Sequence, residues 1–251
     1  MKDQKVLAYC NLFGVLSAIP TLLELDPEAQ KLIKHKKISL GFLIKGGPSA
    51  TLSFAKGGAE MFPGVKKCSI KLNFDTCKSF NDMIDGKGKP KLSGGIWHAL
   101  FLTGKFTKLT DLLSKYLRPS PADLEDPVFF ERSTTLMLHV IAGSIAAVGN
   151  YDKIGTFSAS NIVDGTVKLG IANGPMVGIE VKNHHLRALH TCPANSMSEM
   201  TFDSFKTARD LFDGKINAIA AVGLGQVRIG GMVSQVDNVN RILDRVALYM
   251  A

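Results

Sequence analysis

Apolar residues follow two patterns along the chain, one typical of buried helices and one typical of strands. Residues 6–19 and 128–148 are apolar on nearly every face of a helix, so each is predicted to be a core helix. Pro127 and Gly149 bound the second run, as expected at the start and end of a helix. Shorter apolar runs separated by turn residues predict extended strands. These strands are expected at 38–44, 50–54, 68–74, 167–171, 176–181, 186–189, 197–202 and 226–229.

Helical spacing returns after the strands of each half. Residues 75–84 and 203–212 are predicted helices, and residues 216–222 form a further short apolar segment. The chain closes with a helix whose apolar residues share one face. These residues are Val236, Val239, Ile242, Leu243, Val246 and Met250. Elements in this order predict the α+β class, with mostly antiparallel sheets covered on one face by helices.

The chain also resembles itself. A shift of 129 residues brings matching residues together, and Asp85, Gly86 and Lys87 later fall on Asp213, Gly214 and Lys215. The pairs at the constant shift are Leu7 with Leu136, Gly14 with Gly143, Ala18 with Ala147, Leu40 with Leu169 and Gly41 with Gly170. Ordered matches of this kind predict two tandem copies of one domain, at 1–118 and 128–251. Residues 119–127, with Pro119, Pro121 and Pro127, are the expected linker.

Composition places the chain among globular proteins. It has 251 residues, of which 45% are hydrophobic and 21% charged, and no uninterrupted apolar run is long enough to span a bilayer. The basic-then-apolar order at 1–19 is that of a secretory signal, but the repeat matches it to a segment in mid-chain. We therefore expect a core helix there. Four widely spaced cysteines favour a reducing, cytoplasmic location.

Positive charge is concentrated in the first half. Residues 1–125 hold 19 Lys and Arg against 11 Asp and Glu, whereas residues 126–251 hold 11 of each. Five of these lysines are candidates to face an anionic membrane, and an ordinary solvated surface is the alternative. They are Lys34, Lys36, Lys37, Lys66 and Lys67. Nucleic acid is not expected as a partner, because Arg118 is the sole arginine in that half.

One block of the second half has a recognisable order of elements. Residues 202–231 read as a helix, the residues Asp213, Gly214 and Lys215, a second short helix, and a strand that ends at Gly230 and Gly231. With the preceding runs at 167–170 and 179–182, this block resembles the sterol carrier protein type two family. The likeness covers about residues 165–250 and, through the repeat, extends more faintly to 38–117.

The resemblance implies an apolar tunnel that holds a fatty acyl chain, a sterol or a similar lipid, with no catalytic residue. We expect the following side chains to line it, although each is also compatible with an ordinary core position. They are Phe74, Phe80, Met83, Ile84, Trp97, Phe101, Phe202, Phe205, Ala208, Leu211, Phe212, Ile216, Ile219, Val222 and Met232. The register of the first copy after Gly86 stays open.

Residues that carry other chemistry are scarce. His184, His185, His190 and Cys192 are the best metal-like group, but their spacing favours surface histidines in a hairpin turn, so no metal is expected. Dinucleotide, Walker A and nucleophile-elbow motifs are missing, and no cofactor is expected.

We therefore predict a non-enzymatic protein that binds a lipid, with lipid transfer as a candidate further role. The alternatives are a structural tandem-domain protein with filled cores and a lipid-presenting subunit of an acyl-metabolising enzyme. The sequence leaves open which lipid binds, whether both domains bind it, and the oligomeric state.

Overall fold

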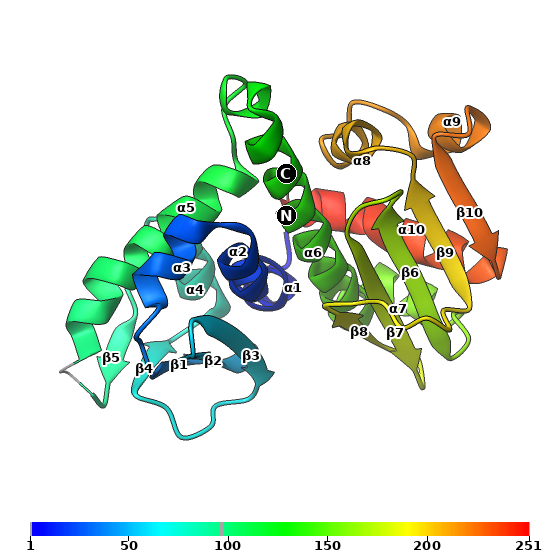
Figure 1. Cartoon of the computed structure of the whole chain (residues 1–251). Coiled ribbons are helices and arrows are strands. Elements are labelled where there is room, and N and C mark those ends of the chain that lie inside the picture. Colours follow the sequence, from blue (N-terminus) through cyan, green and yellow to red (C-terminus); the bar gives the residue numbers. More distant parts are fainter. Residues whose placement is uncertain (1, 96–97, 251) are drawn as a thin grey trace. The chain divides into compact units, whose positions relative to one another are not determined.

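The computed structural model describes residues 2–95 and 98–250, which form two compact units, Met1–Arg132 and Ser133–Ala251. Each unit contains a five-stranded sheet and several helices, so the α+β class is confirmed (Figure 1). The expected linker, 119–127, contains the short turn Asp123–Glu125 and the first residue of a helix. The exact domain bounds stay a prediction.

Unit 1 opens with a continuous helical segment and continues into its sheet. The segment is α1 (Gln4–Cys10), a π turn η1 (Asn11–Val15), a 3-10 turn η2 (Leu16–Ala18) and α2 (Ile19–Leu25). The remaining elements are α3 (Pro27–Ile33), β1 (Ile38–Ile44), β2 (Ser49–Ala55), β3 (Gly58–Pro63), β4 (Ile70–Phe74), α4 (Cys77–Ile84), β5 (Lys91–Ser93), η4 (Phe101–Phe106) and α5 (Thr107–Leu117).

Unit 2 follows the same plan from the long helix α6 (Pro127–Tyr151), which begins at the end of unit 1. The remaining elements are α7 (Lys153–Ala159), β6 (Gly165–Ile171), β7 (Met176–Lys182), β8 (His185–Leu189), β9 (Ser198–Phe202), α8 (Phe205–Phe212), α9 (Ala218–Gly223), β10 (Val227–Gly231) and α10 (Val233–Met250).

Both sheets are mixed, so the expectation of antiparallel sheets is only partly right. The strand orders are β3-β2-β1-β4-β5 and β8-β7-β6-β9-β10. In each sheet three pairings are antiparallel, and one, β1 with β4 or β6 with β9, is parallel. Apolar alternation determines which face a strand buries but not its partner, because both pairings expose side chains with the same period of two.

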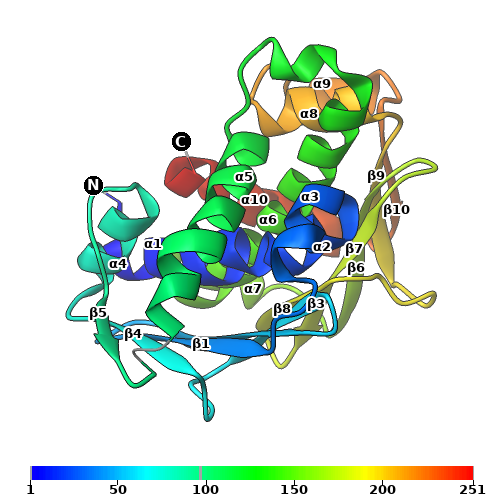
Figure 2. The same cartoon turned by 60° about the vertical axis from the view of Figure 1, so that its left-hand side comes forward.

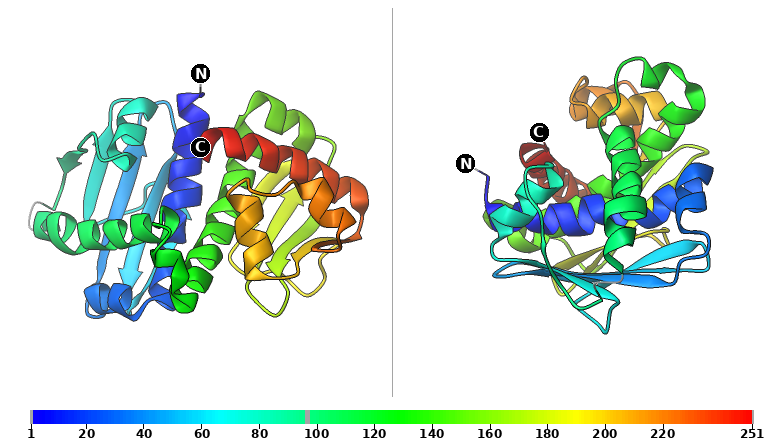
Figure 3. Two further views of the ribbon diagram at one scale, coloured as in Figure 1. Left: turned by 90° about the horizontal axis from the view of Figure 1, so that it is seen from above. Right: turned by 90° about the vertical axis from the view of Figure 1, so that its left-hand side faces the viewer.

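Helices cover one face of each sheet. In unit 1 the segment from α1 to α2 lies along the sheet (Figures 2 and 3). Leu40 and Phe42 of the central strand are fully buried. In unit 2 most residues of α6 are buried. A Cβ at Gly149 would lie 2.7 Å from Leu186 of β8 and 3.3 Å from Ile242 of α10. The glycine therefore lets α6 approach both elements closely.

Two helices, Gln4–Leu25 and Pro127–Tyr151, are long and apolar enough to cross a membrane. In their most apolar stretches, 67% and 83% of the residues are buried. Core helices of soluble proteins pass the same test, so these two are weak evidence for a membrane span. Their burial agrees with the sequence-based interpretation of both as core helices.

A buried aspartate and a tyrosine form the same contact in both units. Asp26 caps the start of α3 and accepts a hydrogen bond of 2.6 Å from the hydroxyl of Tyr116, near the end of α5. Asp152 caps α7 and accepts one of 2.7 Å from Tyr249, near the end of α10. The last helix of each unit is thus tied to the helix that precedes its sheet.

Hydrogen bonds decide the charge state of these aspartates. Burial raises the pKa of Asp152, but bonds from Arg245, Tyr249 and two backbone N–H groups outweigh it and hold that pKa at about 2. Burial acts in the same direction on Asp26, where hydrogen bonds from Tyr116 and the α3 backbone leave the pKa below its usual value. Both carboxylates are therefore ionised at neutral pH.

The strand pairings refine the alignment of the first half of the chain with the second. In the parallel pairs, Ile44 lies opposite Phe74 and Ile171 lies opposite Phe202. The central strands therefore correspond at a shift of 127 residues, which also relates the turn residues Gly47 and Gly174. The sequence comparison, at 129 for the strand, is two residues out of step. Such a slip preserves the face of every side chain, and for that reason the pattern alone does not reveal it.

Removal of one hydroxyl tests the aspartate–tyrosine contact. We expect Tyr249→Phe and, separately, Tyr116→Phe to lower the free energy of unfolding by about 1–3 kcal/mol, because each leaves a buried carboxylate short of a donor. Urea denaturation measures the change. Tyr151→Phe is the control, since this side chain is 41% exposed, and it should change the value by less than about 0.5 kcal/mol. Equal losses in all three variants would contradict the account.

Stability should also depend on His139 of α6. Its ring centroid lies 4.8 Å from that of His190, and burial, with a smaller effect of His190, lowers the pKa of His139 from 6.5 to about 4. In the unfolded chain His139 takes up a proton below pH 6.5, whereas in the folded chain its buried ring stays neutral down to about pH 4. Stability should therefore fall by up to about 3 kcal/mol as the pH drops through this window.

Unfolding experiments between pH 7 and pH 4 check this dependence. His139→Phe should flatten the decline, whereas His185→Gln, at an exposed position, should leave it unchanged. If the stability of His139→Phe falls with pH as steeply as that of the natural chain, other titratable groups cause the decline.

Candidate functional site

Helices α4 and α8 are equivalent elements that follow a buried strand in each unit. Thr76 caps α4 and Ser204 caps α8, each through its side-chain oxygen. An exposed ion pair repeats as well, Lys78 with Asp82 and Lys206 with Asp210. A shift of 128 residues relates every one of these positions, so the two helices are directly comparable.

In unit 1 the aromatic residues Phe74, Phe80 and Phe101 of the expected lining pack in the core. The Phe80 ring is fully buried, and its centroid lies 5.1 Å from that of Phe74 and 6.5 Å from that of Phe42. The two contacts are edge-on, the arrangement in which aromatic rings pack favourably. Phe101 is also buried and packs edge-on against Phe54. These rings occupy the space between α4, η4 and the sheet.

Unit 2 has a methyl group where unit 1 has a phenyl ring. Ala208 is the counterpart of Phe80 and is fully buried. On the same helix, Phe212 packs edge-on against Phe202, and the Phe205 ring lies over Gly174, at a position where a Cβ would be only 3.3 Å away. Phe205 and Phe212 are only half-buried. The buried position at the middle of the helix is therefore smaller in unit 2, whereas the aromatic side chains Phe205 and Phe212 flank it on α8.

Apolar side chains continue to the surface beyond α8. Leu211 and Ile216 are half-buried, whereas Val222 of α9 is 38% exposed and Met232 is 37% exposed. Leu224, which the sequence analysis did not select, is 74% exposed. Apolar side chains on α8, on α9 and after α9 are therefore partly accessible to solvent.

The fifteen expected lining residues are divided between the two units and differ in burial. Buried ones are Phe74, Phe80, Phe101, Phe202 and Ala208. Half-buried ones are Met83, Ile84, Phe205, Leu211, Phe212 and Ile216, and exposed ones are Val222 and Met232. Trp97 and the side chain of Ile219 lie outside the described residues. Their role as a lining stays a prediction.

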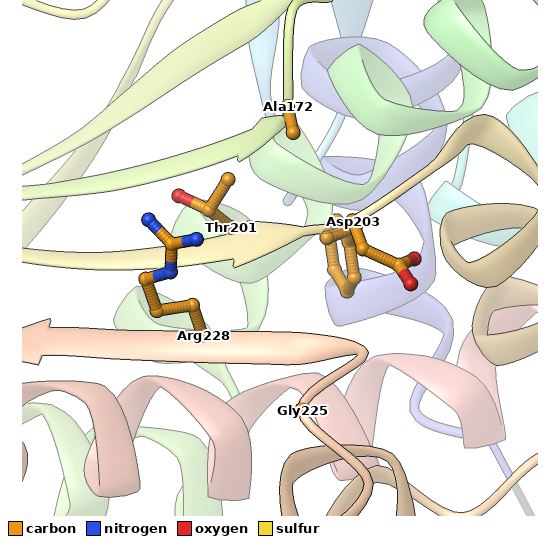
Figure 4. Close-up of a pocket in the computed structure, with 6 residues that line it drawn as sticks. Ala172, Thr201, Asp203, Gly225 and Arg228 are labelled. Carbon is orange, nitrogen blue, oxygen red and sulfur yellow. The ribbon is translucent and has the colours of Figure 1, made fainter.

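A small hollow lies at the ends of the parallel strands β6 and β9 (Figure 4). Its volume is about 60 Å³, and it is lined by Ala172, Thr201, Phe202, Asp203, Gly225 and Arg228. Sites for drug-sized ligands have volumes of roughly 300–1,000 Å³. As it stands, this hollow is too small for a lipid chain.

Sequence reasoning missed Arg209 of α8, a buried charge between two aromatic residues. Its Nη1 donates a hydrogen bond of 2.8 Å to Ser133 of α6, and its Nε lies 2.9 Å from a carboxylate oxygen of Asp213. Burial raises the pKa of Asp213, but Lys215 and Arg209 outweigh it and leave that pKa below its usual value. The signal in the sequence was a basic residue at helical spacing from Phe205 and Phe212.

The candidate membrane-facing lysines fall in two segments of unit 1. Lys34, Lys36 and Lys37 lie between α3 and β1, while Lys66 and Lys67 lie in the connection from β3 to β4. This connection is fixed to β2 by Thr51, which accepts a hydrogen bond from the Lys66 backbone, and to β1 by Ser39. The two groups of lysines therefore lie around the first half of β1.

The histidine group does not make a metal site among the described residues. His184 lies in the β7–β8 turn with a φ of 61°, His185 is exposed, and His190 contacts the ring of His139. No group of three His, Cys, Asp or Glu side chains within residues 2–95 and 98–250 is arranged to hold a metal ion.

Comparison with known proteins gives solved structures alone: no protein-family model matches, and no curated protein does. A ubiquinone synthesis protein, UbiJ-SCP2, is 12% identical over 43% of this chain and 95% of its own, with a TM-score of 0.34. The sterol carrier protein domain 2 of Helicoverpa armigera is 17% identical over 42% of this chain and 84% of its own, with a TM-score of 0.35.

An enzyme is also among the similar structures. The sec-alkyl sulfatase PisA1 is 10% identical and matches 58% of this chain, which spans 28% of the sulfatase, with a TM-score of 0.28. The structural neighbours thus include sterol carrier domains, each covering less than half of the chain. With TM-scores below 0.5, none of these matches is an argument for function.

Proposed function

We propose that the protein binds and carries a lipid without catalysing a reaction, and that unit 2 holds the lipid between its sheet and the helices α8 and α9. The observation that carries the proposal is the difference between the two units at one buried position. Unit 1 has Phe80 there, whereas unit 2 has the smaller Ala208, flanked on α8 by the half-buried side chains Phe205 and Phe212. The sterol-carrier-like order of elements at 202–231 supports the same conclusion.

Binding requires α8 and α9 to move away from the sheet, because the hollow of about 60 Å³ is far below the size of a lipid chain. The exposed Val222 and Leu224 on the α9 side would then contact the lipid in place of water. A chain of about 16 methylenes gains roughly 13 kcal/mol when it leaves water, at ~0.8 kcal/mol for each methylene. This gain is large enough to offset helix movement and association.

Unit 1 has a different role in this proposal. Its aromatic core is filled, so we assign no lipid to it, and the filled core is the observation that favours a structural role for this unit. Its lysines around β1 would approach an anionic membrane from which lipid is taken or to which it is delivered. A cytoplasmic location fits the free cysteines and this contact.

Filling of the site in unit 2 tests lipid binding. Ala208→Phe restores the ring of the equivalent position in unit 1, so we expect it to weaken the binding of cis-parinaric acid, a fluorescent fatty acid, at least about tenfold. Fluorescence titration of the full chain measures the affinity. Overpacking in a tight core costs about 1–3 kcal/mol, so Ala208→Leu provides a smaller change of the same kind.

Leu248→Lys is the control for this titration, because Leu248 is exposed near the end of α10. It lies about 22 Å along the helix from Val233, the first residue of α10, which directly follows the expected lining residue Met232. This variant should bind the probe as the natural chain does. If Ala208→Phe and Ala208→Leu fold and bind with unchanged affinity, the lipid does not occupy the space beneath α8.

Vesicle sedimentation tests the lysine surface. Lys66→Ala with Lys67→Ala is expected to reduce binding to vesicles that contain phosphatidylglycerol by about fivefold or more, at roughly 1 kcal/mol for each lysine near the surface. Lys153→Ala with Lys182→Ala removes the same charge from unit 2 and should have little effect. Equal losses in the two double variants would show that net charge alone governs the binding.

A further inference from the structure

The two units differ in charge over equivalent stretches of the chain. Residues 36–74, which comprise β1 to β4 and their connections, contain seven lysines against one acidic residue, Glu60. Residues 163–202, the corresponding stretch of unit 2, contain three Lys and Arg against three Asp and Glu. The seven lysines are Lys36, Lys37, Lys45, Lys56, Lys66, Lys67 and Lys71. Six of them are exposed, and within residues 2–95 and 98–250 none of the seven forms an ion pair.

One face of the unit 1 sheet is covered by helices (Figure 1), because Phe42 of β1 contacts the ring of Phe80 on α4. Side chains alternate between the two faces of a strand, so Gly41 and Leu43 belong to the opposite face, here called the outer face. Lys71 belongs to it as well, since it lies opposite Gly41 in the parallel pair of β1 with β4. Leu43 is 45% exposed and Lys71 is exposed, as expected for a face that the helices leave uncovered.

The connection from β3 to β4 crosses the outer face and carries two more lysines. The side-chain oxygen of Thr51 on β2 accepts a hydrogen bond of 2.9 Å from the backbone N–H of Lys66. A Cβ at Gly41 would lie 3.1 Å from a methyl carbon of Val65, so this glycine makes room for the connection. The exposed Lys66 and Lys67 therefore lie over the outer face, in a layer beyond the strands.

Unit 2 neutralises the charge at the equivalent position. In the parallel pair of β6 with β9, Lys168 lies opposite Glu199, and the two side chains form an ion pair. Unit 1 has Gly41 and Lys71 at this step of the pair, related to those residues by shifts of 127 and 128. A lysine thus replaces the acidic residue. The positive charge of the outer face is therefore a property of unit 1 and not of the shared fold.

Apolar groups among these lysines favour a lipid surface as the partner. Leu43 lies on the outer face, and so does the half-buried Phe62, which lies opposite Thr51 in the pair of β2 with β3. The Nζ of Lys66 lies 4.2 Å from the centroid of the Phe62 ring. Apolar side chains can enter the boundary of a bilayer while neighbouring ammonium groups stay with the phosphates. Nucleic acid is disfavoured because residues 36–74 contain no arginine, the residue best suited to its phosphates and bases.

We propose that unit 1 docks on an anionic membrane through the outer face of its sheet, with the lysines at the level of the phosphates and Leu43 in the headgroup layer. This inference rests on the membrane contact in the proposed function and deepens it, because it names the docking face and adds an apolar contact. It also assigns three further lysines to the contact. Lys71 lies on the face itself, and Lys45 and Lys56 lie in the turns after β1 and β2.

Sedimentation of the full chain with vesicles of equal parts phosphatidylcholine and phosphatidylglycerol tests the face. Lys45→Ala with Lys71→Ala should weaken binding about fivefold or more, since lysines near an anionic surface each contribute to the attraction. Lys87→Ala with Lys89→Ala is the matched control. It removes the same charge from unit 1, but from the connection that packs against the end of α4 on the covered face.

The control should change binding by less than about twofold, because attraction to the surface falls off within a Debye length. Equal losses in the two double variants would show that net charge alone governs the binding, and would overturn the docking face.

Leu43→Thr tests the apolar contact. Threonine suits an exposed strand position, so this variant should fold. It should bind the same vesicles about threefold more weakly, and this loss should persist as salt is raised from roughly 0.1 M to roughly 0.5 M, whereas the effect of the lysines should shrink. Unchanged binding of Leu43→Thr at both salt concentrations would overturn the entry of Leu43 into the headgroup layer.

A short DNA duplex is the competing probe. Tighter binding of the natural chain to DNA than to the vesicles, at equal phosphate concentration, would assign the face to nucleic acid and overturn the inference. If the natural chain binds no vesicles, both the docking face and the membrane contact of the proposed function are wrong. Binding of cis-parinaric acid, measured on the same samples, decides separately whether lipid binding by unit 2 stands.

Discussion

The structure depends on the burial of a helix that is apolar on nearly every side. Such a helix cannot lie on a surface, so each unit must cover it with a sheet on one side and with further helices on the others. In unit 2, α6 is closely packed at Gly149, where β8 and α10 both approach it. The buried Asp152 and Tyr249 then hold α10 against the start of α7.

Within this framework, one position distinguishes the units. Phe80 fills unit 1, whereas Ala208 leaves the corresponding layer of unit 2 to half-buried aromatic side chains. The neighbouring position differs as well, since Asn81 joins a neutral hydrogen-bond network whereas Arg209 pairs with Asp213. Two adjacent residues thus distinguish the buried side of α8 from that of α4. A shared plan with one divergent helix is the basis on which we propose a structural role for one unit and lipid binding for the other.

Much of this was predictable from local pattern. The strands that alternate strongly, such as Ile38–Ile44, and the helix around Phe205 and Phe212 lie close to their expected positions. The edge strands Gly58–Pro63 and Lys91–Ser93 were missed, because glycine, proline and lysine replace apolar alternation where one side of a strand has no partner. Parallel pairing of β1 with β4 joins residues 30 positions apart, and no local pattern encodes it.

The site was harder to predict than the fold. Aromatic residues such as Phe80 and Phe212 follow the same helical spacing, yet one is buried and the other half-open, because neighbours from other strands decide the packing. The sequence analysis did not select Arg209, whose buried guanidinium donates to Ser133, 76 positions away in the chain. Spacing therefore identified the helix but not which of its side chains faces a ligand.

Native mass spectrometry of the full chain, purified gently from cells and followed by lipid extraction, tests the central claim most directly. The account predicts one lipid per chain, which is released when Ala208 is replaced by a larger residue. A clean mass without any lipid, from a chain that also fails to take up added fatty acid, would contradict it and assign both units a structural role.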